Sequence, residues 1–278
     1  MSRISSSWEL VKASWGVLLA DKELVIFPII SFFASMAVVV TFFLPMLFAG
    51  VFDAIFVNGG EFAGFVVGFA FYVVLYFVTF FFNSALVGAA MIRLEGGDPT
   101  VGDGLRIASQ HIGAILGYSV IAATVGMILR AISERSGILG RIVIGLVGFV
   151  WNIATFLVVP VLVMEKLGPI DGVKRSAELL KKTWGEQIVG NFSIGLIFGL
   201  LMFGVILVGG ALAVALLAVE LTWAAIAIAL LMMLALIVLG LISSSLNGIF
   251  TAAVYQYATT GESKYFDPAT VKNTFKQK

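Results

Sequence analysis

The sequence lacks cysteine, contains a single histidine and carries few charged residues. Without cysteine the chain has no disulfide bond, no thiolate metal site and no cysteine nucleophile. One histidine, His111, gives neither a multi-histidine metal site nor a base paired with a nucleophile. Lys, Arg, Asp and Glu make up only 12% of the 278 residues, whereas 60% are hydrophobic. A soluble domain of this length could not cover its surface with so few charges.

Six long stretches of the chain contain no charged residue. They cover residues 24–52, 62–92, 112–129, 142–164, 187–219 and 221–261. A bilayer core of roughly 30 Å takes about 20 helical residues to cross. Because lipid offers no hydrogen-bond partner to the backbone, each stretch must be helical. The fold class predicted is therefore all-α: one transmembrane domain over 1–278, a polytopic bundle of six transmembrane helices with a tail at 262–278. The start of the chain lacks a signal peptide's pattern, so the first stretch is expected to be retained.

The distribution of the 17 basic residues predicts the orientation of the six helices. Fourteen fall on the side of the two termini, and only Arg130, Arg135 and Arg141 fall on the other. The positive-inside rule then places both termini in the cytoplasm of a multi-pass protein of the cell membrane. The three exceptions are expected to extend their side chains toward lipid head groups. Glu220 precedes Trp223 and is predicted to lie in an outer turn.

Residues 7–16 and 176–185 match at seven of ten positions, counting Ser and Thr as alike. Each segment is amphipathic at the helical period and precedes a transmembrane stretch, as is typical of a helix lying in the membrane interface. Trp15 and Trp184 are the expected anchors at head-group depth. A weaker copy follows Asp98-Pro99. The chain is thus interpreted as three tandem units, each an interfacial helix plus a helical hairpin, covering 1–97, 98–168 and 169–261.

Asparagines interrupt three of the hydrophobic stretches near their expected midpoints. They are Asn83, Asn152 and Asn247, and the first and third precede a glycine by fourteen residues. A carboxamide in lipid lacks partners, so each must face a neighbouring helix or a cavity. With Ser244 of the Ser243–Ser245 run, they form the candidate polar intramembrane cluster: Asn83, Asn152, Asn247 and Ser244. The cluster either joins helices by hydrogen bonds or lines a solute site. Pro28 and Pro160 are expected to kink their helices.

Several segments resemble a prokaryotic family of six-helix membrane proteins of unknown function. They are Asp98-Pro99-Thr100-Val101, Trp151 to Pro160 with Thr155, Arg175-Ser176 with Thr183-Trp184-Gly185, and Tyr255 to Gly261. This resemblance extends over nearly the whole chain. The helix-hairpin design is more distantly similar to the membrane domain of some bacterial glycerophosphodiester phosphodiesterases. Neither resemblance implies an activity or catalytic residues for this chain.

No phosphate-binding loop, paired midplane carboxylates or Ser/His/Asp set can be assembled, so no enzymatic activity, cofactor or metal is expected. A net charge of +1 without a basic stripe argues against nucleic acid as a partner. The leading hypothesis is a membrane scaffold or accessory protein that organises membrane lipids, or a membrane or cytoplasmic protein partner, through its interfacial helices. The alternative is a transporter or channel for a small or lipid-like solute. A cavity at the asparagines would favour the alternative.

Overall fold

The computed structural model of this protein describes the backbone of residues 3–48 and 60–261. Side chains are described for residues 11–45, 62–181 and 194–261. Over these residues the secondary structure is entirely helical, which confirms the all-α fold class. The elements are α1 (Arg3–Ala20), the 3-10 helix η1 (Lys22–Val25), α2 (Ile26–Phe48), α3 (Gly60–Leu94), α4 (Val101–Gln110), α5 (Ile112–Glu134), α6 (Ile138–Ala154), α7 (Val158–Met164), α8 (Pro169–Ala218) and α9 (Thr222–Thr260).

Six of the described segments are long and apolar enough to cross a membrane, as predicted. They are Lys22–Pro45, Phe62–Leu94, Ile112–Glu134, Ile138–Met164, Ile194–Ala218 and Thr222–Thr260. Large hydrophobic side chains are exposed along all six. In water such surfaces would be unfavourable, but in a bilayer the lipid covers them. The chain is therefore a multi-pass membrane protein.

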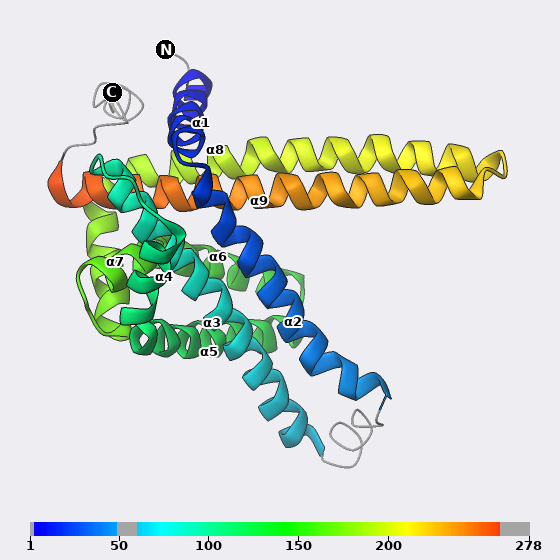
Figure 1. Cartoon of the computed structure of the whole chain (residues 1–278). Coiled ribbons are helices and arrows are strands. Elements are labelled where there is room, and N and C mark those ends of the chain that lie inside the picture. Colours follow the sequence, from blue (N-terminus) through cyan, green and yellow to red (C-terminus); the bar gives the residue numbers. More distant parts are fainter. Residues whose placement is uncertain (1–2, 49–59, 262–278) are drawn as a thin grey trace.

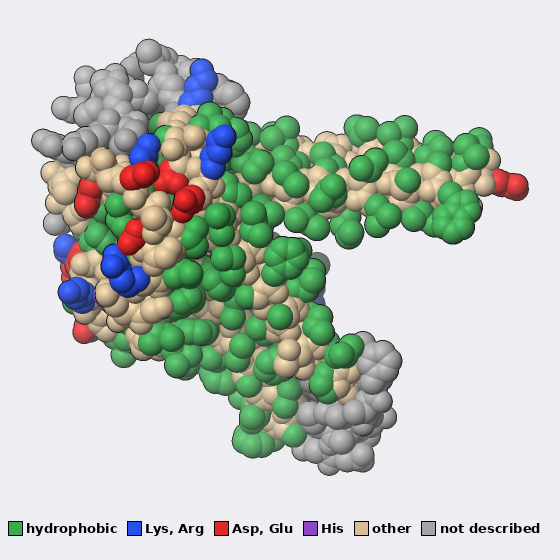
Figure 2. All heavy atoms as spheres, viewed as in Figure 1, with side chains coloured by type: hydrophobic (Ala, Val, Ile, Leu, Met, Phe, Trp, Pro, Cys, Tyr) green, Lys and Arg blue, Asp and Glu red, His purple; other side chains and the backbone are tan. Residues whose placement is uncertain are grey.

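The spanning helices form three hairpins that leave a common base in different directions (Figure 1). The α2–α3 and α8–α9 hairpins are close together at the base and diverge away from it, and α1 runs across the direction of the α8–α9 hairpin (Figure 1). On the face seen in Figure 2, charged side chains gather at the base and the hairpins are hydrophobic. Glu220 has a left-handed φ of 62° in the turn between α8 and α9. This confirms that Glu220 lies in a turn.

The fourth span is interrupted between α6 and α7, upstream of Pro160, as the kink prediction requires. Proline lacks an N–H, so the carbonyl of Phe156 has no helical partner. Two other backbone groups at the break are paired by the fully buried side chain of Ser176, from α8: its Oγ donates to Ala154 O at 2.7 Å and accepts from Leu157 N–H at 3.1 Å. One hydroxyl thus joins the fourth span to the start of α8.

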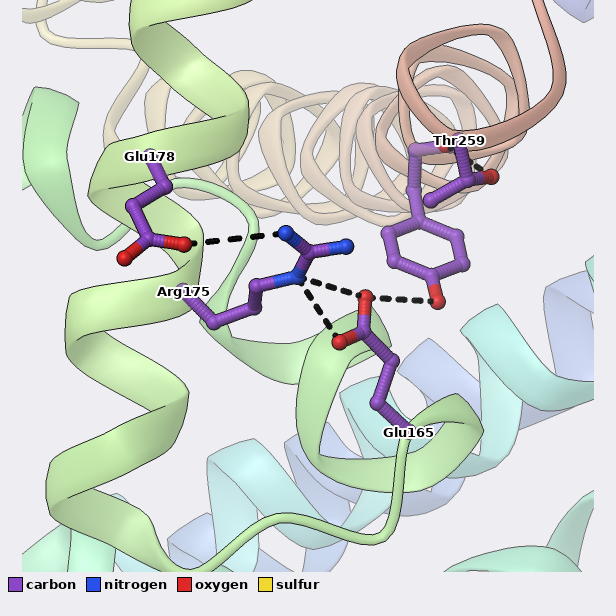
Figure 3. A network of polar contacts seen from close by, with 5 residues as sticks. Glu165, Arg175, Glu178 and Thr259 are labelled. Carbon is purple, nitrogen blue, oxygen red and sulfur yellow. Dashed lines mark hydrogen bonds and ion pairs between the residues drawn. The ribbon is translucent and has the colours of Figure 1, made fainter.

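The prediction of a separate interfacial helix at the start of the third unit is wrong, because residues 169–185 are the beginning of the 50-residue helix α8. No proline follows Pro169 within this segment, and a glycine inside a helix costs only about 1 kcal/mol, so backbone hydrogen bonding continues into the fifth span. The first part of α8, which carries Arg175 and Glu178, nevertheless runs across the direction of α9 (Figures 1 and 3). The division into three tandem units stays a prediction.

Near the base, α4 and α9 each pack closely against α3. Two glycines allow the helices to approach closely there. A Cβ on Gly104 of α4 would lie 2.6 Å from the carbonyl oxygen of Ala85 in α3. A Cβ on Gly248 of α9 would overlap the side chain of Leu86 in α3. These contacts fix the level at which α3 and α9 face each other, and therefore which of their polar side chains meet.

Candidate intramembrane binding site

A cavity of about 400 Å³, the polar cavity, lies among the spanning helices α2, α3, α8 and α9. It is lined by Phe27, Pro28 and Ser31 of α2, Thr79, Phe82, Asn83 and Leu86 of α3, Met202 of α8, and Gly240, Ser243, Ser244, Asn247, Gly248 and Thr251 of α9. Seven of these fourteen residues have polar side chains and none is charged. The polar cavity lies close to the base, from which the α2–α3 and α8–α9 hairpins diverge (Figure 1).

The polar lining follows from helical periodicity in α3 and α9. Thr79 and Asn83 are four residues apart, as are Ser243 and Asn247, so each pair lies on one face of its helix. The close approach at Gly248 brings the two faces together, since a Cβ placed there would lie 3.6 Å from Asn83 Oδ1. At Gly240, two turns away, a Cβ would meet only Met202 Cε of α8, at 3.9 Å. The same helix pair is therefore tight at one level and leaves a cavity at the next.

Hydrogen bonds within the helices decide what the lining offers to a ligand. Thr79 Oγ1 donates to Leu75 O at 2.9 Å, and Thr251 Oγ1 donates to Asn247 O at 2.8 Å. Both hydroxyl protons are thus occupied, and the two oxygens keep lone pairs for other donors. Asn247 Oδ1 is buried without any hydrogen-bond partner. A buried polar atom of this kind is rare in a native structure and marks a place where a partner is missing.

The structure brings three of the four predicted cluster residues together: Asn83, Asn247 and Ser244 all line the polar cavity. Asn152 does not line it. It is exposed near the end of α6, so the expectation that all three asparagines face the bundle interior is wrong for Asn152. The physical reason is the position of α6, which contacts α5 and α8 at the side of the bundle and does not pack between α3 and α9.

Sequence analysis missed several lining residues, among them Thr79 and Ser31. A usable signal was present for Thr79, because it precedes Asn83 by one helical turn. Thr251, one turn after Asn247, belongs to the polar stretch of the sixth hydrophobic segment that begins at Ser243. Ser31 carried no such signal, since its place in the lining depends on how α2 packs against α3 and α9.

Trp15 lies on the outer face of α1. Its side chain is 39% exposed, and Leu19, one turn on, is 55% exposed, while Val11, Ser14 and Val17 are buried on the opposite face. An exposed Trp and Leu on a helix at the charged end of the molecule fit an interfacial helix. The side chain of Trp184 lies outside the described residues. The head-group anchoring of Trp15 and Trp184 stays a prediction.

A polar network connects Glu165, which directly follows α7, with α8 and α9 (Figure 3). Arg175 Nε of α8 donates to Glu165 Oε2 at 2.8 Å and Oε1 at 3.2 Å, and Tyr255 OH of α9 donates to Glu165 Oε1 at 3.3 Å. Arg175 also pairs with Glu178 at 3.6 Å. The hydrogen bond to Glu165 raises the pKa of Arg175, which keeps the guanidinium charged. Tyr255 follows Thr251 by one turn, so this network fixes the end of α9 that borders the polar cavity.

His111 lies between α4 and α5, at a second cavity of about 440 Å³ that Lys166 also lines. Its Nδ1 is 2.8 Å from the carbonyl oxygen of Ile107. Among the described residues, no group of three or more His, Asp or Glu side chains could hold a metal ion. The polar cavity is the place where the structure brings together residues that the sequence had already grouped as a candidate site.

These observations define a multi-pass, all-helical membrane protein with an uncharged polar cavity among its spans. The chain belongs to a family of unknown function, DUF6159, whose model matches residues 62–265. The matched region contains α3 and α9, which supply both asparagines of the cavity. No curated protein and no solved structure matches the chain. The family match and the six apolar helices support the predicted resemblance to a membrane protein family of unknown function. Nothing links the chain to glycerophosphodiester phosphodiesterases.

Proposed function

We propose that this protein is a carrier for a lipid-like solute, which it binds in the polar cavity. The observation that carries the proposal is a cavity of about 400 Å³ with seven polar side chains, located among helices that otherwise expose hydrophobic residues. This volume falls within the range of roughly 300–1,000 Å³ that is usual for small-molecule sites. Of the two hypotheses from the sequence, the cavity favours the transporter over the scaffold.

The polar lining is costly in a membrane unless something binds to it. In hydrocarbon a polar group without a partner costs several kcal/mol, so polar residues within spans face other helices, water or a ligand. Asn83 and Asn247 lie on facing helices, yet Asn247 Oδ1 has no partner. Interhelical hydrogen bonding therefore leaves Asn247 Oδ1 without a partner, and the proposed solute would supply one.

The surroundings of the cavity favour an amphipathic solute. Beyond the cavity the α2–α3 and α8–α9 hairpins diverge (Figure 1), and α2 and α9 carry exposed hydrophobic side chains such as Phe33, Met36 and Leu234. A solute with a polar head in the cavity can extend an apolar chain along these helices. We place the protein in the cell membrane with both termini in the cytoplasm, because fourteen of its 17 basic residues lie on that side.

The test is to fill the cavity without disturbing the fold. A Cβ on Gly240 would meet only the tip of Met202, at 3.9 Å, so Gly240→Leu is expected to fold and to occupy part of the cavity. Gly199→Leu on α8 is the matched control, because Gly199 has open space around it and does not line the cavity. Lipid retained by the purified full chain is quantified by mass spectrometry, and transbilayer movement of a fluorescent lipid analogue is followed in vesicles.

Wild type and Gly199→Leu should retain the same lipid and move the analogue at the same rate. Gly240→Leu should lose most of both activities. Equal lipid retention and equal movement in all three proteins would refute the carrier proposal.

A further inference from the structure

The geometry points to an uncharged lipid alcohol as the occupant of the polar cavity, a glycerolipid with a free hydroxyl such as a mono- or diacylglycerol. This inference rests on the proposed function and names its substrate class. It depends on two properties of the lining: which charges are within reach, and which hydrogen-bonding atoms are still available.

No counter-ion is within the lining for a charged head group. The polar side chains there are Ser, Thr and Asn. The charged side chains that flank the lining at η1 and α3 lie outside it: Glu23 Oε2 accepts from Val101 N–H at 3.0 Å, and Arg93 Nη1 donates to Gly97 O at 3.2 Å and pairs with Asp98 at 3.5 Å. A phosphate or ammonium group would therefore be desolvated without compensation, which strongly disfavours it.

Beside the hydroxyl groups of Ser31, Ser243 and Ser244, which can donate or accept, the lining presents acceptor atoms that need a hydrogen-bond donor from the ligand. Thr79 and Thr251 have committed their protons to their own helices, and Asn247 Oδ1 has no donor. Three oxygens therefore present lone pairs that only an O–H or N–H group can satisfy. Amide N–H groups of Asn83 and Asn247 can donate to the ligand's own oxygen. A hydroxyl group both donates and accepts, whereas an ester, an ether or a quinone only accepts and would leave Asn247 Oδ1 unpaired.

The experiment compares three photoactivatable probes that have identical acyl chains and differ only in the head group. They are a diacylglycerol, its 3-O-methyl ether, and the corresponding phosphatidic acid. Each is incorporated into phosphatidylcholine vesicles that contain the full-length protein, and labelled peptides are identified by mass spectrometry. We expect the diacylglycerol to label peptides containing Asn83 or Asn247 roughly tenfold more strongly than either of the other probes, the difference expected from one unsatisfied buried group.

Variants assign the preference to particular atoms. Asn247→Leu and the isosteric Thr251→Val should each reduce the preference for the alcohol over its methyl ether to about twofold or less, while labelling continues. Thr251→Val also guards against the case in which Asn247→Leu does not fold. Asn152→Leu is the matched control, because Asn152 is exposed outside the cavity, and it should retain the full preference.

The outcomes separate the two proposals. If the ether or phosphatidic acid labels these peptides as strongly as the alcohol does, or if Thr251→Val retains the full preference, the alcohol inference is wrong and the carrier proposal stands. If no probe labels peptides from the cavity, the proposed function itself fails.

Discussion

Removing the Ser176 hydroxyl should destabilise the bundle more than any ordinary Ser→Ala substitution on its surface. The side chain is fully buried, and its Oγ is the partner of two backbone groups at once, Ala154 O at 2.7 Å and Leu157 N–H at 3.1 Å. Both groups lie at the break between α6 and α7, where the helix cannot satisfy them. Ser176→Ala leaves a backbone acceptor and a backbone donor unpaired.

The expected magnitude follows from those two groups. An unsatisfied buried polar group costs about 1–3 kcal/mol. Ala154 O is only partly buried, so the lower end applies to it, and the total expected for Ser176→Ala is about 2–4 kcal/mol. When the protein unfolds within the membrane, the polar groups can find other hydrogen-bond partners there. The measured loss should therefore lie toward the lower end of this range.

The assay is reversible unfolding of the purified protein by SDS in mixed micelles, followed by circular dichroism. Ser136→Ala is the matched control, because Ser136 is only partly buried and its Oγ donates to Ile132 O, one turn back along the chain, at 2.6 Å. It should change the free energy of unfolding by less than about 0.5 kcal/mol. A change of that small size for Ser176→Ala would refute the role of its hydroxyl at the break.

Three further changes test the packing and electrostatics near the base. Gly104→Ala should lower the free energy of unfolding by about 1–3 kcal/mol, because the new Cβ would lie 2.5 Å from Phe27 Cζ. Glu165→Gln should lower it by about 1–2 kcal/mol through loss of the charged pair with Arg175. Hydrogen bonds with Thr100 lower the pKa of Asp103 below its usual 3.8, so this carboxylate stabilises the fold above that pH, and the contribution is lost on acidification. The free energy of unfolding, measured between pH 5 and pH 3, should show this loss in the wild-type protein and not in Asp103→Asn.

Each of these changes has a control in the same region. Gly102→Ala should be neutral or stabilising, since its Cβ would meet only Thr100 Oγ1 at 3.6 Å. Asp171→Asn removes an exposed ion pair with Lys174 and should have almost no effect. If a variant and its control change the free energy of unfolding by the same amount, the contact removed in that variant does not contribute to stability. For Asp103, an equal acid response in wild type and variant would contradict the assigned cause.

The six spans could be predicted from the sequence because their signal is the absence of charge over about 20 residues or more. That signal depends on the lipid solvent and not on tertiary packing. It fails where the structure depends on packing at the membrane surface. The segment ending at Trp184 has the amphipathic pattern of a separate interfacial helix, yet α8 continues through it. Hydrophobic periodicity indicates the faces of a helix but not whether the next span is a new helix.

The candidate site could be predicted only in part, for a related reason. A polar residue in a hydrophobic stretch must be covered, but its position along the chain does not say by which neighbour. Asn83 and Asn247 occupy helices that pack against each other, whereas Asn152 occupies α6, which packs at the side of the bundle. Helix–helix packing is decided by small residues and side-chain shape, which a single sequence does not rank.

Gly248 and Gly240 together explain why the polar faces of α3 and α9 enclose a cavity and do not pack directly against each other. At Gly248 the missing Cβ lets α9 approach α3 against Leu86, and this contact aligns the Ser243–Asn247 face with the Thr79–Asn83 face. Two turns away, Gly240 has no side chain to fill the space that opens as the hairpins diverge. A larger residue at Gly248 would push α9 and α3 apart where they contact at Leu86. One at Gly240 would close only the cavity, which is why the test of function uses Gly240 and leaves Gly248 unchanged.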